Sequence, residues 1–199
     1  MFNKNGFLTL GEDIFVYKNF VTDKECEILI REAISVPEDK WKQNFNDHGL
    51  GNERSMIWTE ELIPIHERIK CILEKEVNLG IDRGLVRMKQ GTKGAIHSDN
   101  HDSLHIRDAN KLVKEDEDFD LGENTIAGII LYFNNFDGGD LLYLDQGIIY
   151  HPEKGDLVIH SAEEHCIHQV QELKSGIRYF HSNNLFQYIR VPKGFNNVA

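Results

Sequence analysis

The chain has 199 residues, of which 40% are hydrophobic and 28% are charged, and its formal net charge is −11. This length and composition are ordinary for a soluble globular protein and allow a sizeable core, so we expect one domain over residues 1–199. The acidic balance argues against a broad nucleic-acid-binding surface, because phosphate contacts need clustered lysines and arginines; it suits a neutral or basic substrate, or simply solubility.

The N-terminal part of the chain is expected to form a helical support over residues 1–80. Phe7–Phe20 mixes aromatic and β-branched residues and predicts an early strand. Thr22 and Glu25 stand in capping-box positions and predict the start of a helix, which a proline ends at Pro37. The apolar stripe at helical spacing in between consists of Cys26, Leu29, Ile30 and Ala33.

Residues 38–58 are polar with scattered aromatics and predict a loop across the surface. A second helix is expected from about Thr59 to Val77, where Pro64 comes early enough to be tolerated. Its apolar face would consist of Ile65, Ile69, Ile72 and Leu73.

The rest of the chain, residues 81–199, predicts short strands. Segments rich in β-branched and aromatic residues alternate with glycine, proline and Asp-Gly turn signals. The expected strands are Leu85–Met88, Ala95–Asp99, Thr125–Asn134, Leu141–Leu144, Ile148–Tyr150, Asp156–His160, Cys166–Val170 and Ile177–Tyr188. Two helices followed by such strands predict a mainly β protein, a jelly roll with the helices packed on one sheet.

A polar stretch from His101 to Asn124 interrupts the predicted strands. It contains KEDEDFDLGEN, with six acidic residues in eleven. A loop of this length inside a compact domain is usually functional or disordered. It is therefore either a lid over a site or a solvated acidic loop.

The cysteines and the apolar segments indicate a cytoplasmic protein without a membrane partner. Cys26, Cys71 and Cys166 are odd in number and far apart, so neither a zinc ribbon nor a disulfide framework is predicted. The N-terminal segment lacks an apolar run of signal-peptide length. The longest apolar run, Ile126–Phe133, is too short to cross a bilayer.

The chemistry is expected in two stretches. The segment GAIHSDN holds His97 and Asp99 two positions apart, and in an extended strand this spacing puts both side chains on the same face. A second stretch some seventy residues later holds His165, His168 and Arg178. Two histidines and one carboxylate on one face leave open coordination positions, which suits non-haem Fe(II) and oxygen chemistry.

A His-x-Asp pair alone is a weak signal, because any chain with ten histidines contains such pairs by chance. A single histidine is more often a surface residue or a hydrogen-bonded core residue, and five others are interpreted in this way. These residues are His48, His66, His151, His160 and His181. His101 and His105 lie nearer the metal ligands in the sequence and could contact a substrate.

Groups of residues in a fixed order extend the pattern over about half the chain, from residue 84 to residue 188. They are His97-Ser98-Asp99, Leu131-Tyr132-Phe133-Asn134, Gly138-Gly139-Asp140-Leu141, Gly155-Asp156-Leu157 and the run of His168, Val170, Leu173, Gly176 and Arg178. In order and spacing these groups resemble the prolyl-4-hydroxylase-type branch of the Fe(II)- and 2-oxoglutarate-dependent dioxygenases.

The resemblance implies a double-stranded β-helix fold and iron ligation by His97, Asp99 and His168. It also implies that Arg178 anchors 2-oxoglutarate, and the planar fork of arginine can hold a carboxylate in bidentate fashion. A structural salt bridge is the other interpretation of Arg178. Tyr132 would add a hydroxyl to the same carboxylate, or it is a core aromatic residue.

Two positions need comment beside this resemblance. The family often has a tyrosine two residues before a glycine on the strand that enters the His-x-Asp turn, and here Lys89 precedes Gly91. Lys89 would contact 2-oxoglutarate or substrate through its charge, or point to solvent. The offsets to the following glycine and arginine favour His168 over His165 as the distal ligand. The acidic insertion at 114–124 matches no motif of the family.

The expected function is a dioxygenase that hydroxylates an unactivated C–H bond with Fe(II) and 2-oxoglutarate as cofactors, and the resemblance also associates the chain with L-ascorbate. A prolyl residue of a peptide or protein is the first expectation for the substrate, and small molecules remain open. Two other classes remain: a cupin-like isomerase or hydrolase with the same ligands on another metal, and an inactive jelly-roll binding module. The first of these would leave Arg178 no carboxylate to hold.

Overall fold

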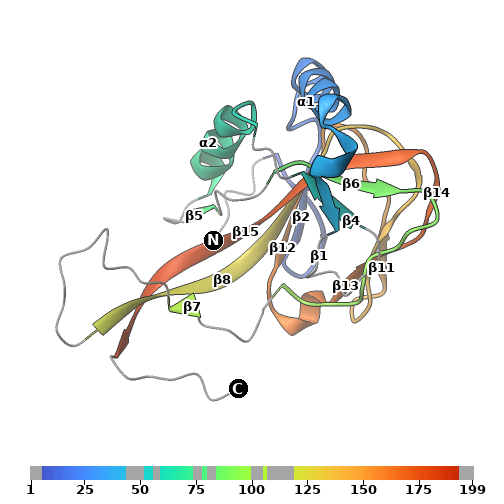
Figure 1. Cartoon of the computed structure of the whole chain (residues 1–199). Helices are drawn as coiled ribbons and strands as arrows, with labels where there is room; N and C mark the ends of the chain where they lie inside the picture. Colours follow the sequence, from blue (N-terminus) through green and yellow to red (C-terminus); the bar gives the residue numbers. More distant parts are fainter. Residues whose placement is uncertain are drawn as a thin grey trace.

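A computed structural model describes residues 6–43, 52–55, 59–73, 78–79, 84–99, 105–106 and 119–192 (Figure 1). The helices are α1 (Asp23–Ser35), α2 (Leu62–Ile72) and the short 3-10 helices η1 (Glu38–Lys40) and η4 (Glu164–Cys166). The strands are β1 (Leu8–Gly11), β2 (Ile14–Tyr17), β3 (Trp41–Gln43), β4 (Asn52–Ser55), β5 (Asn78–Leu79), β6 (Val86–Lys89), β7 (His105–Ile106), β8 (Phe119–Tyr132), β9 (Asp137–Gly138), β10 (Leu141–Tyr143), β11 (Ile148–Tyr150), β12 (Leu157–Ser161), β13 (His168–Val170), β14 (Leu173–Ser175) and β15 (Ile177–Pro192). None of the helices in the described ranges is long and apolar enough to span a membrane.

The strands form a large and a small antiparallel sheet that pack face to face. The large sheet has the order β1-β2-β12-β8-β15-β6-β4-β3, with β5 beside β15 and β7 beside β8. The small sheet has the order β11-β10-β13, and a third pair joins β14 to β9. One apolar cluster contains residues of both sheets, among them Ile130, Val158, Leu141 and Val170. The predicted jelly roll, a double-stranded β-helix with a mainly β composition, is therefore confirmed.

The strand β8 separates two cores by simple alternation. Ile129 and Leu131 belong to the cluster under α1 and α2, whereas Ile130 and Tyr132 belong to the cluster between the two sheets. Successive side chains of a strand point to opposite faces, so the consecutive apolar residues at the end of β8 must be covered on both sides. Both helices cover the same face of the large sheet, as the sequence predicts (Figure 1).

The start of α1 is also as predicted. The side chain of Thr22 accepts a hydrogen bond from the backbone N–H of Glu25, and the carboxylate of Glu25 accepts one from the backbone N–H of Thr22. Arg68 of α2 donates to both carboxylate oxygens of Glu25, at 2.6 and 3.0 Å, so the same glutamate caps one helix and ties it to the other. The pair lowers the pKa of Glu25 to about 2, chiefly through the hydrogen bonds from Arg68.

Two predictions for the N-terminal part were wrong. The expected single strand over Phe7–Phe20 is the hairpin of β1 and β2, which turns at Asp13 with a positive φ of 54°. The expected loop over residues 38–58 contains η1, β3 and β4, and β4 pairs with β6 of the large sheet. Backbone pairing with a neighbour, rather than an apolar pattern, makes these polar segments strands.

Differences also occur around the predicted strands of the C-terminal part. Ala95–Asp99 is not a strand; it makes an isolated bridge through His97. β8 begins at Phe119, inside the stretch expected to be a loop, and pairs with β15 as far as Pro192 in a ribbon that leaves the body of the molecule (Figure 1). The two-residue strand β9 and the strand β14 were not predicted. His48, His101 and residues 107–118 lie outside the described residues.

Candidate metal centre

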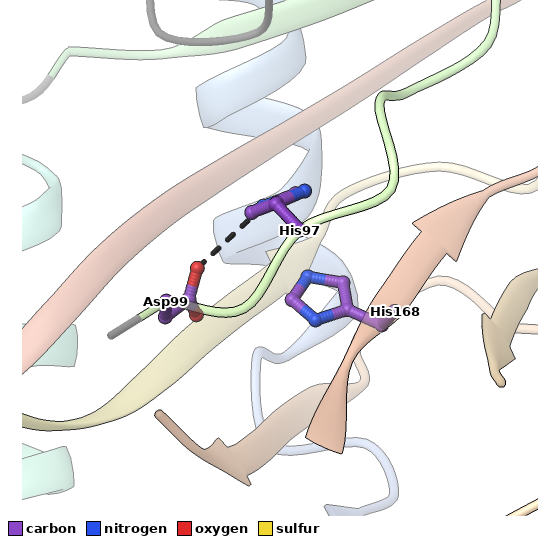
Figure 2. Close-up of side chains that lie close together, drawn as sticks. All are labelled: His97, Asp99 and His168. Atoms are coloured by element: carbon purple, nitrogen blue, oxygen red, sulfur yellow. Dashed lines mark ion pairs between the residues drawn. The ribbon is translucent and has the colours of Figure 1, made fainter. Parts of the chain in front are cut away.

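The two histidines of the site come from backbones that are bonded to each other. The N–H of His97 donates to the carbonyl of His168 at 3.1 Å, and the N–H of His168 donates to the carbonyl of His97 at 2.9 Å. This isolated bridge attaches the segment before Asp99 to the edge of the small sheet, next to β13. The two imidazole rings consequently lie with their centroids 4.5 Å apart (Figure 2).

Asp99 completes a cluster of three side chains. Its Oδ1 lies 3.6 Å from Nε2 of His97 (Figure 2). One ligand atom from each of His97, Asp99 and His168 lies within 4.8 Å of the other two, and no other cluster of this kind is found among the described residues. Two imidazoles and a carboxylate this close can hold a divalent metal on one side and leave its other positions open.

Backbone carbonyls fix which nitrogen of each imidazole faces the cluster. Nδ1 of His97 lies 3.0 Å from the carbonyl of Ala95, and Nδ1 of His168 lies 3.1 Å from the carbonyl of Cys166. A carbonyl only accepts, so each Nδ1 carries the proton and each Nε2 keeps a free electron pair. The tautomers that a metal requires are therefore set by the protein.

The charges of the cluster also suit a cation. Burial lowers the pKa of His168 to about 3, so its imidazole is neutral at physiological pH. Burial alone would raise the pKa of Asp99, but the hydrogen bond from His160 and the nearby imidazoles hold it below its ordinary value. A deprotonated carboxylate beside the neutral imidazole of His168 is the protonation state in which these two groups bind metal.

His160 is a residue of the site that the sequence analysis placed only among core histidines. It lies on β12, directly across from Gly128 of β8, and its Nε2 is 2.9 Å from Oδ2 of Asp99. Alternation along β12 carried the signal, because Val158 points between the sheets and His160 must then do the same. The sequence did not show that Asp99 lies beside it.

Arg178 and Tyr132 lie in the same interior, between the two sheets. Arg178 is fully buried, with its guanidinium over the rings of Phe180, Tyr132 and Phe136 at 4.4, 5.1 and 5.5 Å. Its Nη1 donates to the carbonyl of Gly139 at 3.1 Å. The hydroxyl of Tyr132 is buried and has no hydrogen-bond partner among the described residues, and burial raises its pKa to about 12. This region combines a buried cation with an unused hydroxyl donor.

Lys89 is not brought to this region. Its ammonium lies 3.0 Å from Glu38 and 3.1 Å from Glu53, on the face of β6 opposite to Met88. Met88 is buried with Tyr132 and Phe180 and pairs with Arg178 across the sheet. The side chain of β6 that faces the interior is thus an apolar one.

The remaining histidines of the described ranges lie apart from the cluster. His165 lies 3.4 Å from the carboxylate of Asp13, and His151 contacts Asp140. His66 and His181 are buried against each other between α2 and β15. The backbone of His105 lies in β7.

No family model matches the sequence, and no curated protein matches it. Solved structures share its fold. A viral collagen prolyl hydroxylase from Paramecium Bursaria Chlorella virus-1, solved with 2OG, is 18% identical, with a TM-score of 0.62 over 88% of this chain and 97% of that one. A prolyl-4-hydroxylase from Pseudomonas putida is 16% identical, with a TM-score of 0.58 over 87% and 91%. A prolyl hydroxylase from Trichoplax adhaerens, solved with a hypoxia inducible factor peptide fragment, is 14% identical, with a TM-score of 0.58 over 92% and 84%. The chain therefore has the fold of these 2OG-Fe(II) oxygenases.

Proposed function

We propose that this protein is an Fe(II)- and 2-oxoglutarate-dependent dioxygenase that hydroxylates an unactivated C–H bond. The observation that carries the proposal is the cluster of His97, Asp99 and His168, with both Nε2 atoms free for a metal, inside a jelly roll whose interior also buries Arg178. Two imidazoles and one carboxylate are the ligand set of non-haem Fe(II) oxygenases.

The residues around Arg178 fit a dicarboxylate cofactor. A carboxylate needs a fixed cation and hydrogen-bond donors. The guanidinium of Arg178 lies 5.1 Å from the ring centroid of Tyr132, whose buried hydroxyl has no hydrogen-bond partner among the described residues. Burial removes both groups from water, which strengthens their interaction with an anion. We assign to them the distal carboxylate of 2-oxoglutarate.

The protein would position the reactants and exclude water. His97, Asp99 and His168 would hold the metal on one side, and the aromatic rings around Arg178 would keep the cofactor's carboxylate dry. Iron and 2-oxoglutarate together would supply the oxygen activation that amino-acid side chains lack. No general acid or base is required, and we name none.

For the substrate we propose a prolyl residue in a peptide or protein. Support comes from the fold shared with prolyl hydroxylases, one of which was solved with a peptide fragment. Because substrate-reading loops vary more than their scaffold, this part of the proposal needs its own test. Proline-containing peptides should stimulate succinate formation and gain one oxygen atom by mass spectrometry, whereas matched peptides with alanine for proline should not.

The test of the reaction class is an anaerobic titration of the protein with Fe(II) and then 2-oxoglutarate. We expect a visible metal-to-ligand charge-transfer band that decays when oxygen is admitted, with succinate formed. L-Ascorbate is added to one of two matched assays, so that its expected contribution is measured. Asp99→Asn and His168→Ala serve as controls and should abolish turnover. Iron binding without a band would contradict the proposal and favour a cupin-like metal enzyme.

A further inference from the structure

The two carboxylate oxygens of Asp99 have different partners. Oδ1 faces Nε2 of His97 at 3.6 Å, on the side of the cluster. Oδ2 lies 2.9 Å from Nε2 of His160, a side chain that is almost completely buried on β12. One oxygen is thus directed to the candidate metal and the other to the protein.

The orientation of the His160 ring is fixed by a second hydrogen bond, at the nitrogen that does not face Asp99. The hydroxyl of Tyr143, on β10 of the small sheet, lies 3.0 Å from Nδ1 of His160. A carboxylate only accepts hydrogen bonds, so the proton of a neutral His160 must be on Nε2, and Nδ1 is left to accept from the tyrosine hydroxyl. Tyr143, His160 and Asp99 form a chain in which every donor meets an acceptor.

Gly128 makes room for this chain. It is the cross-strand neighbour of His160. A Cβ at this position would overlap Oδ2 of Asp99 and lie 2.6 Å from Nε2 of His160. Only a residue without a side chain allows the carboxylate and the imidazole to meet over β8.

We infer that His160 is a positioning residue, which engages Oδ2 of Asp99 so that the carboxylate binds the metal through Oδ1 alone. The inference rests on the proposed function, since it requires a metal at His97, Asp99 and His168. A hydrogen bond to the outer oxygen fixes the rotation of a ligating carboxylate, and groups in this position are worth about 10- to 100-fold in metal affinity. Single-oxygen ligation leaves open the position that a second carboxylate oxygen would occupy.

The test measures binding of Co(II), a spectroscopic substitute for Fe(II), to the full chain without cofactor or substrate. His160→Phe keeps an aromatic ring and removes the N–H donor, and it should weaken Co(II) binding about 10- to 100-fold and change the visible d–d bands. His160→Gln can place an amide donor where Nε2 lies and should restore most of the affinity and the spectrum. His66→Gln, a change at a buried histidine between α2 and β15, is the matched control and should bind Co(II) like the wild type.

The outcomes separate the inference from the proposed function. If the wild type binds no Co(II), the metal site itself is wrong, and the proposed function fails with it. If the wild type binds Co(II) and His160→Phe binds it equally well with unchanged bands, the metal site stands and the positioning role is overturned. Should His160→Phe not fold, His160→Met and Tyr143→Phe replace it, and unchanged affinity and bands in both would overturn the inference.

Discussion

At the scale of single residues, the site depends on an absent side chain as much as on the present ones. Gly128 has an ordinary strand conformation, so its backbone does not require glycine. The requirement comes from Asp99 and His160, whose side-chain atoms occupy the space of a Cβ. Such a glycine marks a close approach that the strand pattern alone does not reveal.

This geometry predicts the effect of Gly128→Ala. The methyl group must displace the carboxylate of Asp99, so we expect metal affinity to fall at least about as far as for loss of the positioning histidine, 10- to 100-fold. Gly147→Ala is the control: its Cβ would meet nothing within 4 Å, but φ is +63°, so it strains the backbone away from the site. Calorimetric titration with Co(II) should show a loss for Gly128→Ala and none for Gly147→Ala, and equal affinities would contradict the geometry.

Arg178→Lys keeps the positive charge but removes the planar guanidinium, and with it the two-pronged contact to a carboxylate and the stacking on the ring of Phe180. We expect 2-oxoglutarate affinity to fall about tenfold or more, because hydrogen bonds to charged groups are worth about 1.5–3 kcal/mol each. Metal affinity should not change. The measurement is the charge-transfer band as a function of 2-oxoglutarate concentration.

Lys89→Gln is the matched control for this cofactor assignment, because Lys89 is paired with Glu38 and Glu53 on the other face of β6. It should leave the 2-oxoglutarate titration unchanged. A loss of affinity in Lys89→Gln with none in Arg178→Lys would reverse the assignment of the two residues.

At the scale of secondary-structure elements, a pair of buried histidines joins α2 to β15. Nε2 of His66 lies 3.0 Å from Nε2 of His181, whose Nδ1 is 3.2 Å from the carbonyl of Gly84. Nδ1 of His181 therefore carries a proton, and its Nε2 accepts from Nε2–H of His66. A proton taken up by His66 would go to its Nδ1 and would place a positive charge in a buried site.

The burial of His66 predicts how the free energy of unfolding depends on pH. Burial, with a smaller effect of Lys70, lowers the pKa of His66 to about 4 from 6.5, although Glu67 acts in the opposite direction. Below pH 6.5 the imidazole of His66 therefore binds a proton in the unfolded chain, whereas in the folded chain it stays neutral down to about pH 4. The contribution of neutral His66 to the free energy of unfolding should be fully present above pH 6.5. It should be lost as the pH falls toward 4, which lowers the free energy of unfolding by up to about 3 kcal/mol.

Urea unfolding of the metal-free protein between pH 4 and 7 tests this dependence. His66→Gln can still donate to His181 but cannot titrate, so its pH slope should be shallower than that of the wild type. Part of the slope should remain, because the pKa of buried His168 is also lowered, to about 3. An unchanged slope in His66→Gln would contradict the prediction.

The sequence predicted the elements that have a local residue pattern. It did not predict the strands that form only because their backbone pairs with a neighbouring strand. The capping box of α1 and the apolar strand β11 lie where their residues indicate. The polar strands β3 and β4 have no such pattern, because only their neighbours in the sheet make them strands. The same distinction applies to the histidines of the cluster. Offsets along the sequence predicted His168 as a ligand, and it lies beside His97 and Asp99. His160 was not predicted there, because its partner Asp99 is distant in sequence and adjacent only in the fold.

At the scale of the whole molecule, the candidate metal centre is held in place by hydrogen bonds within the protein. The bridge between His97 and His168 consists of backbone hydrogen bonds, and backbone carbonyls hold both imidazoles. We therefore expect a chelator to leave the far-ultraviolet circular dichroism unchanged. Added metal should raise the free energy of unfolding only by mass action, by about 2.7 kcal/mol at a hundredfold excess over the Kd. Unfolding on chelation would show instead that metal binding and folding are coupled.

The sharing of β8 between two cores has a consequence for cooperativity. Ile129 and Leu131 face the helices, and Ile130 and Tyr132 face the small sheet, so neither core can open while the other keeps the strand in place. Amides along the middle of β8 should then exchange with deuterium only through global unfolding. The strand that carries Gly128 under the carboxylate of Asp99 should then be among the last parts of the molecule to open, so the floor of the candidate metal centre should persist for as long as the fold does.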